Sequence, residues 1–554
     1  MKEKIKNIRY GIIIVIVAIL VSIPLCWKNL NYYKDDGIQH IARAFLTSEA
    51  MQKGESFQVL SRLENGFGYS WDLFYGPFSS FSVAVIGNLF HNIIVGYKIV
   101  LFLGMLLSGV TMYYLVKSIT DDRNVGVLAS ILYMTMPYHL TDMYLRGSIG
   151  EFLSFIFVPL VFLGIYHLFH EEKRDWLLVI GAVGLIITHN LMTMICALVA
   201  FVYVAINLPK LKIKRVREKF FFNIIFILCI SSFFWVPFLG TSMSSRYEVY
   251  EPGKMATAKS VQENGILLRQ LVVTYNDGSY VFEFGPHILI MICFTIAAFR
   301  RIVPEMKKEY IFFLLIGILS TFMTTKYFPW KWLGEKASFI QFPWRMLEIS
   351  TFCFSIICAI NLGIVIKNFK FVDAIVLGSI AVIYAFALKG FAPITEEKLQ
   401  NPKDMDFEFV TGRNTDCLVG MGKNEYLPKN VYDEYFYLAN RENAILVLEG
   451  EANIENYKKD GNQLSAKIEV TEKDTLLELP YVYYPGFTAT VDGAKIPTFE
   501  SKNGFVSIGL GKLSKADLKV EYTGTSGSKV AKTLSIISTI LFGVYVIVQK
   551  FEKE

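Results

Sequence analysis

Charged residues are scarce in this sequence, and that scarcity excludes most soluble architectures. Lys, Arg, Asp and Glu make up 19% of the 554 residues and hydrophobic residues 53%, and the mean hydropathy is +0.40. A typical soluble domain carries about 25% charged residues. The apolar residues also form runs of the roughly 17–25 residues that cross a bilayer. The composition therefore predicts a polytopic α-helical membrane protein.

Several motifs are missing as well. The sequence has no glycine-rich phosphate loop of the P-loop or dinucleotide type. Six of the seven cysteines lie in apolar segments without metal-ligand spacing, and Cys417 stands alone in its region, so no disulfide is expected there. The net charge of +6 reflects basic loops that anchor a membrane protein, so no nucleic-acid partner is expected.

Twelve apolar runs predict membrane spans. Met1–Tyr10 is basic, and the run from Gly11 to Trp27 has no small-residue cleavage site, which indicates a retained first helix rather than a signal peptide. The predicted spans are 11–27, 97–117, 124–140, 150–169, 175–189, 191–208, 219–240, 285–300, 309–326, 345–366, 371–389 and 529–548.

Lysine and arginine are concentrated in every second loop, which indicates that these loops lie on the cytoplasmic side of the membrane. This pattern predicts a multi-pass plasma-membrane protein with both termini in the cytoplasm. Residues 28–96, 241–284 and 390–528 then face outward. The apolar stretch 77–92 is too short for a span and is expected to form a partial or interfacial helix at the outer face.

Residues 390–528 have a different composition from the rest of the chain. They carry 22 acidic and 15 basic side chains, a net charge of −7. Four segments are rich in β-formers, and Asp492-Gly493 is a hairpin turn signal. The four segments are 466–470, 488–491, 505–508 and 518–522. The sequence thus predicts a transmembrane domain over 1–389 with a first outer loop at 28–96, an extracytoplasmic β-sandwich over 390–528, and a final helix with a cytoplasmic tail over 529–554.

Ionisable residues gather at the predicted outer ends of the helices. After the first span come Asp35, Asp36, His40 and Arg43. In a helix, Asp36, His40 and Arg43 lie about one turn apart on one face. A carboxylate beside apolar surface can act as a general base. The alternatives are a solvated acidic loop and a metal site, for which two carboxylates and one imidazole are weak support.

A second cluster lies between two predicted spans and contains His139, Asp142, Arg146 and Glu151. Arg146 presents a planar fork of donors that suits a phosphate. The alternative is that Arg146 pairs with Asp142 or Glu151 and only joins two helices, because charges at membrane depth are usually paired.

Two smaller groups complete the set of candidates. His189 lies at a tight outer turn, where a lone histidine is more often a hydrogen-bonded helix-end residue than a catalyst. Arg345 follows Trp344 at the start of a span, with Glu348 one turn later. Arg345 could extend to lipid headgroups beside an interfacial tryptophan, or it could bind a lipid phosphate.

The motifs resemble those of the GT-C superfamily of membrane glycosyltransferases. The chain is most similar to bacterial YfhO-like proteins and to membrane proteins described as related to 6-pyruvoyl-tetrahydropterin synthase. The resemblance extends over nearly the whole chain. It rests on five segments: 35–43, 75–77, 133–147, 341–345 and 484–493.

The resemblance implies a sugar donor carried on polyprenyl phosphate and an acceptor that is an envelope glycopolymer or lipid. Asp36, or Asp35 as the alternative, would activate the acceptor hydroxyl, and the sugar would be transferred with inversion. Arg146 and Arg345 would bind the phosphate, and His40, Arg43, His139, Asp142 and His189 would line the cavity. No cofactor is assigned, although a divalent cation is an alternative. The seven histidines offer no convincing set of three for the zinc site of a pterin synthase.

Two other functions fit the same sequence. A transporter or flippase of a lipid-linked saccharide tends to show inverted repeats and sites near the membrane midplane, neither of which is evident. A non-catalytic envelope-assembly scaffold would use the β-domain to bind a partner. Convergence of Asp36, Arg146 and Arg345 in space would favour the enzyme, and scattered positions would favour the scaffold.

Overall fold

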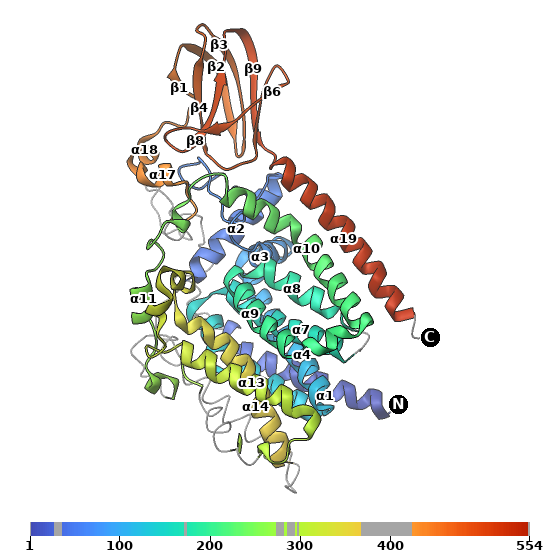
Figure 1. Cartoon of the computed structure of the whole chain (residues 1–554). Helices are drawn as coiled ribbons and strands as arrows, with labels where there is room; N and C mark the ends of the chain where they lie inside the picture. The colour runs from blue at the N-terminus through green and yellow to red at the C-terminus, as the bar shows by residue number, and fades with distance from the viewer. Residues whose placement is uncertain are drawn as a thin grey trace.

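The computed structural model describes residues 2–26, 36–170, 174–272, 282–284, 294–295, 298–366 and 424–551. Asp35, Cys417, the predicted span 371–389 and most of the predicted span 285–300 lie outside these residues. The helices form one body, a β-sandwich lies at one end of it, and both chain termini lie toward the other end (Figure 1).

The body is mostly helical, in agreement with the composition. In the described part of the chain, six helical segments are long and apolar enough to cross a membrane. These are Ile8–Cys26 (within α1, Lys2–Ser22, and η1, Ile23–Cys26), α4 (Ile93–Thr120), α7 (Ile149–Phe169), α10 (Lys214–Ser242), Pro343–Ile364 (within η7, Pro343–Met346, and α14, Leu347–Ile366) and Ser526–Gln549 (within α19, Ser526–Phe551). Three shorter apolar helices are α3 (Phe78–Leu89), α8 (Leu177–Thr188) and α9 (Asn190–Ile206). The other helical elements are α2 (Gly37–Lys53), α5 (Arg123–Thr135), α6 (Pro137–Thr141), η2 (Asp142–Arg146), η3 (Leu208–Lys212), η4 (Glu248–Tyr250), α11 (Ala258–Glu263), η5 (Leu268–Leu271), α13 (Pro304–Met323), η6 (Trp330–Ile340), α17 (Lys429–Asp433) and α18 (Tyr435–Asn440).

The predicted span 124–140 is not one continuous helix. Helix α5 ends at Thr135, and Met136 is extended, with φ −58° and ψ 131°. Pro137 causes this break, because proline disfavours the helical conformation of the residue before it. The chain then forms the short helix α6 and the single π-helical turn η2, which Gly147 follows with φ +62°. The second charged cluster therefore lies on broken helix rather than on a regular one.

The predicted β-sandwich is present at the C-terminal end of the chain. One sheet has the strand order β1-β4-β8-β7 and the other β2-β3-β9-β5-β6, and the strand pairs are antiparallel. The four predicted strand segments lie in β3, β5, β8 and β9. The bounds are β1 Leu446–Glu449, β2 Ala452–Asp460, β3 Gln463–Val470, β4 Thr475–Val482, β5 Phe487–Val491, β6 Ala494–Ile496, β7 Phe499–Glu500, β8 Phe505–Leu510 and β9 Leu513–Tyr522.

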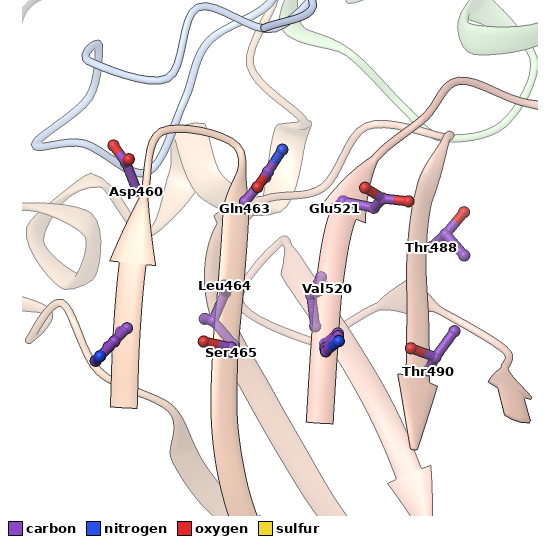
Figure 2. Close-up of a pocket in the computed structure, with 10 residues that line it drawn as sticks. Asp460, Gln463, Leu464, Ser465, Thr488, Thr490, Val520 and Glu521 are labelled. Carbon is purple, nitrogen blue, oxygen red and sulfur yellow. The ribbon is translucent and has the colours of Figure 1, made fainter. Parts of the chain in front are cut away.

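The turn between β5 and β6 is the predicted hairpin. Val491 pairs with Ala494, and Asp492 and Gly493 both have positive φ, as a two-residue turn of the type I′ requires. The outer face of the larger sheet is polar and contains a shallow hollow of about 420 Å³ (Figure 2). Gln463 and Glu521 are exposed on this face, whereas Leu464 and Val520 are buried toward the core, so the strands alternate as in a two-layer sandwich.

The sandwich is attached to the first long loop, which lies between α2 and α3. The backbone N–H of Val482 donates to the carbonyl oxygen of Phe67 at 2.9 Å, and Asn462 Nδ2 donates to that of Val59 at 2.7 Å. The Phe67 ring meets the Phe505 ring edge-on, with centroids 5.4 Å apart. The loop and the sandwich therefore share one packed interface.

Helix α19 leads from the sandwich back along the helical body and packs against α10 (Figure 1). Ser535 Oγ donates to the carbonyl oxygen of Ile230 at 2.6 Å, and Ser232 Oγ donates to that of Ala531 at 2.9 Å. Apolar helices associate through such small polar side chains when both are in lipid.

Candidate functional site

The first and second charged clusters meet through a close backbone contact. The backbone N–H of Asp36 donates to the carbonyl oxygen of Arg146 at 3.0 Å. A Cβ atom on Gly147 would lie 2.6 Å from the Cα of Gly37. Because glycine occupies both positions, the chain entering α2 can lie directly against the chain leaving η2.

Arg146 is the centre of an ion-pair network. Its Nη1 lies 2.6 Å from Asp142 Oδ1 and 2.9 Å from Glu151 Oε2, and its Nη2 lies 3.7 Å from Asp36 Oδ2. Tyr138 also takes part, because its hydroxyl donates to Glu151 at 2.6 Å and accepts from Arg146 at 3.2 Å. The side chains of Asp142 and Glu151 are fully buried, whereas that of Asp36 is 38% exposed. Asp36 is thus the carboxylate of this network that a substrate can reach.

Arg345 joins the same network from a distant part of the chain. Its Nε lies 3.5 Å from Glu151 Oε2, and its side chain is 13% exposed. Its Nη1 donates to Gln341 Oε1 at 2.9 Å. Glu151 therefore bridges two arginines, one from η2 and one from η7. Glu348, one turn after Arg345, is buried and accepts a hydrogen bond from Ser154 at 2.6 Å.

Asp142 and Glu151 share the guanidinium of Arg146. Burial, and then the neighbouring Glu151 carboxylate, raise the pKa of Asp142 well above its usual range, although Arg146 opposes the shift. Two buried carboxyl groups that share one arginine favour retention of a proton.

Arg43 forms a second buried cationic group. It pairs with Asp72 and donates to the carbonyl oxygens of Tyr75 and Gly76 at 3.3 and 3.1 Å. Its guanidinium lies 5.4 Å from the ring centre of Trp71 and 5.1 Å from that of Tyr75. Among the residues that the structure describes, its Nε and Nη1 have no hydrogen-bond acceptor. Buried donors without a partner are costly, so this group is suited to an anionic ligand.

Tyr75 connects Arg43 to two histidines. Its ring centre lies 6.1 Å from that of His40 and 5.6 Å from that of His189. His189 Nδ1 accepts the backbone N–H of Met192 at 3.1 Å, so this histidine also caps α9. Burial, and then the charges of Arg43 and Arg146, lower the pKa of His40 to about 3. His40 is therefore a neutral imidazole at physiological pH.

The structure brings most of the sequence-predicted residues together. Asp36, Asp142, Arg146 and Arg345 belong to one network, and His40, Arg43 and His189 lie around Tyr75. His139 is separate: its Nδ1 contacts the carbonyl oxygen of Tyr133 at 3.0 Å, and its ring stacks on Phe155 with centroids 3.9 Å apart. His139 is thus packed as a core residue among aromatic side chains.

Sequence reasoning missed the partners that hold these groups in place. Asp72, Trp71 and Tyr75 surround Arg43, and Tyr138 joins Arg146 to Glu151. The only local signal for Asp72 is a lone acidic residue in an aromatic stretch. No group of three His, Cys, Asp or Glu side chains that could hold a metal ion occurs within the described ranges.

Comparison with known proteins identifies a family for this chain. A family described as "6-pyruvoyl-tetrahydropterin synthase related domain; membrane protein" matches residues 73–389. This match confirms the part of the predicted resemblance that concerns these membrane proteins. An "Uncharacterized protein" of Lactococcus lactis subsp. cremoris (strain MG1363) is 23% identical over 605 residues, which cover 99% of this chain and 96% of that protein.

Solved structures with partial similarity come from an archaeal enzyme. The oligosaccharyltransferase AglB of Archaeoglobus fulgidus, in complex with an inhibitory peptide and a dolichol-phosphate, gives a TM-score of 0.42 at 13% identity and covers 77% of this chain. An apo form of the Archaeoglobus fulgidus oligosaccharyltransferase gives a TM-score of 0.37 at 11% identity, covering 78% of this chain and 58% of that one. The present chain spans 61% of the length of the first of these.

Proposed function

This chain belongs to the family of membrane proteins described as related to 6-pyruvoyl-tetrahydropterin synthase, and we propose that it is a membrane glycosyltransferase of the GT-C type. In this proposal it transfers a sugar from a polyprenyl-phosphate donor to an envelope glycopolymer or lipid. Residues 1–389 form the transmembrane domain, and residues 390–528 form an extracytoplasmic domain. Both termini are in the cytoplasm, so the charged site is at the outer membrane surface.

One observation carries the proposal: Asp36, Arg146 and Arg345, from three separate segments, converge on one network. Asp36 Oδ2 lies 3.7 Å from Arg146 Nη2. Arg345 Nε lies 3.5 Å from Glu151 Oε2, which lies 2.9 Å from Arg146 Nη1. A scaffold protein has no need for a partly exposed carboxylate beside one buried and one partly exposed guanidinium group. A transferase needs this arrangement, because it must accept a proton and stabilise a phosphate in the same place.

The proposed reaction is a single displacement. The Asp36 carboxylate takes the proton of an acceptor hydroxyl, whose oxygen attacks the anomeric carbon of the donor sugar. The bond between that carbon and the phosphate oxygen breaks, and its electron pair leaves with the polyprenyl phosphate. Attack from the face opposite the leaving group inverts the anomeric configuration. Asp36 is preferred over Asp142 and Glu151 as the base because it is the exposed member of the network.

Arginines are available for the departing phosphate. Arg345 is partly exposed, and its Nε lies 3.5 Å from Glu151 Oε2 without a hydrogen bond among the described residues. Arg43 also has two donor atoms, Nε and Nη1, that find no hydrogen-bond acceptor among the described residues. Arginine binds phosphate through such forked donors. We assign Arg345 and Arg146 to the phosphate, and His40, Arg43 and His189 to the surrounding walls.

The proposed reaction differs from the pterin synthase reaction that the family description mentions. A pterin synthase would require a zinc site of three histidines, and the described residues contain no group of three metal-binding side chains. No step of the proposed reaction is assigned to a metal ion.

The test is replacement of both candidate bases. Asp35→Asn with Asp36→Asn should abolish sugar transfer, while the protein is still expressed and inserted. Transfer is followed by mass spectrometry of envelope polymers from cells that express each variant. Glu49→Gln is the matched control, because Glu49 also lies on α2 and pairs with the partly exposed Lys53 and Arg62.

Full transfer activity in the double variant would refute the proposal. If cells that lack the chain instead accumulate an untransported lipid-linked saccharide, and the double variant restores transport, the flippase function is supported. A double variant that restores the envelope while binding a protein partner supports the scaffold function.

A further inference from the structure

Two rows of polar side chains form the hollow on the outer face of the larger sheet. The strands β2, β3, β9 and β5 lie side by side, and each contributes one residue to each row. The first row is Asp460, Gln463, Glu521 and Thr488, and the second is Lys458, Ser465, Lys519 and Thr490. Figure 2 shows the first row at one level of these strands. The hollow is therefore a polar grid that extends about 14 Å across the sheet, at the usual spacing of neighbouring strands.

The charged side chains of this grid are available to a ligand. Within the part of the chain that the structure describes, no ion pair or side-chain hydrogen bond is formed by the charged side chains of the grid, which are Lys458, Asp460, Lys519 and Glu521. Elsewhere on the same sheet, Lys515 of β9 and Glu455 of β2 form an ion pair at 2.5 Å. Both members of that pair are about half exposed, so exposure alone does not prevent pairing. The grid thus presents ammonium and carboxylate groups to solvent without pairing them.

The lining of the grid selects the chemistry of its ligand. Two lysines balance two carboxylates in formal charge, so the grid favours a ligand without net charge. The lining contains no aromatic side chain on which a flat apolar surface could stack. A hydroxyl group is a donor and an acceptor at once, so it can bond to ammonium, carboxylate and hydroxyl groups alike. The grid is therefore suited to an uncharged molecule that carries many hydroxyl groups.

The grid lies near the far end of the helix that begins at the candidate site. Gly461, in the turn between β2 and β3, lies against the side chain of Glu55, just after the end of α2. Helix α2 begins directly after Asp36 and has 17 residues, a length of about 25 Å at the helical rise per residue. Asn462 of the same turn is hydrogen-bonded to Val59 of the first loop. These contacts hold the grid at a fixed position relative to Asp36.

We propose that this grid binds an uncharged, hydroxyl-rich saccharide chain. The inference rests on the proposed function, and it names the acceptor class as a glycopolymer with free hydroxyl groups rather than a lipid. The carboxylates of Asp460 and Glu521 accept hydrogen bonds from sugar hydroxyls, and the ammonium groups of Lys458 and Lys519 donate to sugar oxygens. The grid holds sugar units that are remote from the reacting hydroxyl, which lies at Asp36 at the other end of α2.

The binding experiment uses the purified full-length chain in lipid nanodiscs, without a lipid donor. The probes are neutral homo-oligosaccharides of glucose, galactose, mannose, rhamnose and N-acetylglucosamine, the methyl glycoside of each sugar, and oligogalacturonate as an anionic counterpart. Binding is measured by saturation-transfer difference NMR, which detects weak ligands.

The test variant combines Lys519→Thr with Glu521→Thr. It removes one cation and one carboxylate of the grid, and threonine is a β-former that suits both strand positions. Lys515→Thr combined with Glu455→Thr is the matched control. It also removes one exposed cation and one exposed carboxylate from the sheet, but both positions lie outside the lining of the hollow.

At least one neutral oligosaccharide is expected to bind, and its methyl glycoside to bind more weakly, because a single ring covers only part of the grid. The test variant should weaken binding of that oligosaccharide by about tenfold, which corresponds to roughly one hydrogen bond to a charged group. The control variant should leave the affinity unchanged. Absence of binding by every neutral oligosaccharide, stronger binding of oligogalacturonate, or equal weakening in both variants overturns the inference.

A second measurement uses the wild-type chain and does not depend on the folding of a variant. Lysines are acetylated with and without the oligosaccharide, and mass spectrometry gives the rate at each position. Lys458 and Lys519 should be protected, whereas Lys515 should react equally fast in both samples. Equal rates at Lys458 and Lys519 with and without the oligosaccharide refute the inference. Neither measurement depends on catalysis, so failure of saccharide binding and failure of the Asp36 experiment remain separate results.

Discussion

Asp36 and Arg146 are joined twice, once through the backbone and once through the side chains. The backbone N–H of Asp36 donates to the carbonyl oxygen of Arg146 at 3.0 Å, and the Arg146 guanidinium lies 3.7 Å from the Asp36 carboxylate. The residues are far apart in sequence, so the two contacts fix the entry of α2 against the end of η2. The proposed base and a proposed phosphate ligand are thereby held as one rigid unit.

Gly147→Ala should separate this pair. Its φ is +62°, and the new Cβ would lie 2.6 Å from the Cα of Gly37, so the two backbones must move apart. A displacement of about 1 Å at a reacting group can reduce a rate about 100-fold. The measurement is the transfer rate of the purified variant.

Gly493→Ala is the control for backbone strain in that experiment. Gly493 also has a positive φ, of +83°, but a Cβ there would meet no atom within 4 Å. A similar loss of activity in both variants would show that strain alone, rather than the contact between Gly147 and Gly37, causes the defect.

Arg146 and Arg345 should respond differently to substitution. Arg146→Gln leaves Asp142 and Glu151 buried without their main cation, and breaking a buried ion pair costs about 3–5 kcal/mol. Arg345 is partly exposed and lies farther from Glu151, so Arg345→Gln should retain stability and lose transfer activity. Thermal unfolding in detergent and the transfer rate are measured for both variants. Equal destabilisation by the two substitutions would contradict this assignment.

His40 should make the protein less stable in acid. Its pKa is about 3 in the folded chain and about 6.5 when unfolded, so between these values the unfolded state binds the extra proton. Stability therefore falls as the pH decreases from about 6.5 toward 3, by up to about 1.4 kcal/mol per pH unit from this residue. His40→Gln should flatten the pH dependence of the melting temperature over that window. An unchanged slope would refute the effect of burial on His40.

The sandwich depends on a buried ion pair. Arg441 Nε lies 3.0 Å from Glu478 Oε1, and both side chains are fully buried. The Arg441 guanidinium also lies over the rings of Phe67 and Phe505, at the interface with the first loop. Arg441→Gln should destabilise the sandwich by about 3–5 kcal/mol, which limited proteolysis can detect.

The exposed pair between Lys515 and Glu455 provides the comparison for Arg441→Gln. Both side chains are about half exposed, and surface pairs of this kind contribute little. Lys515→Gln should leave the proteolysis rate unchanged. Faster proteolysis of Lys515→Gln than of Arg441→Gln would contradict the importance of burial.

The sequence predicted the elements that local patterns determine. The helical body, the four strand segments and the Asp492-Gly493 turn are all present. The break at Met136 was missed because apolar residues continue through it, although Pro137 was a local signal. Six long apolar helices occur in the described residues, and the twelve spans and their orientation stay predictions.

The sequence predicted the arginines of the candidate site but not the carboxylates with which each of them pairs. Arg146 and Arg345 were recognisable because charges are rare near apolar runs. The bridging position of Glu151 and the contact of Arg43 with Asp72 depend on how distant segments pack, which no local spacing reveals. His139 belongs to the same sequence cluster as Asp142 and Arg146, yet tertiary packing places its ring against Phe155.

The connection between the sandwich and α19 is very short. Strand β9 ends at Tyr522 and α19 begins at Ser526, and α19 is hydrogen-bonded to α10. The first long loop is a second anchor, because its Val59 and Phe67 accept hydrogen bonds from the sandwich. With two anchors, a force on the sandwich would be transmitted to the loop that carries Asp72 and Tyr75.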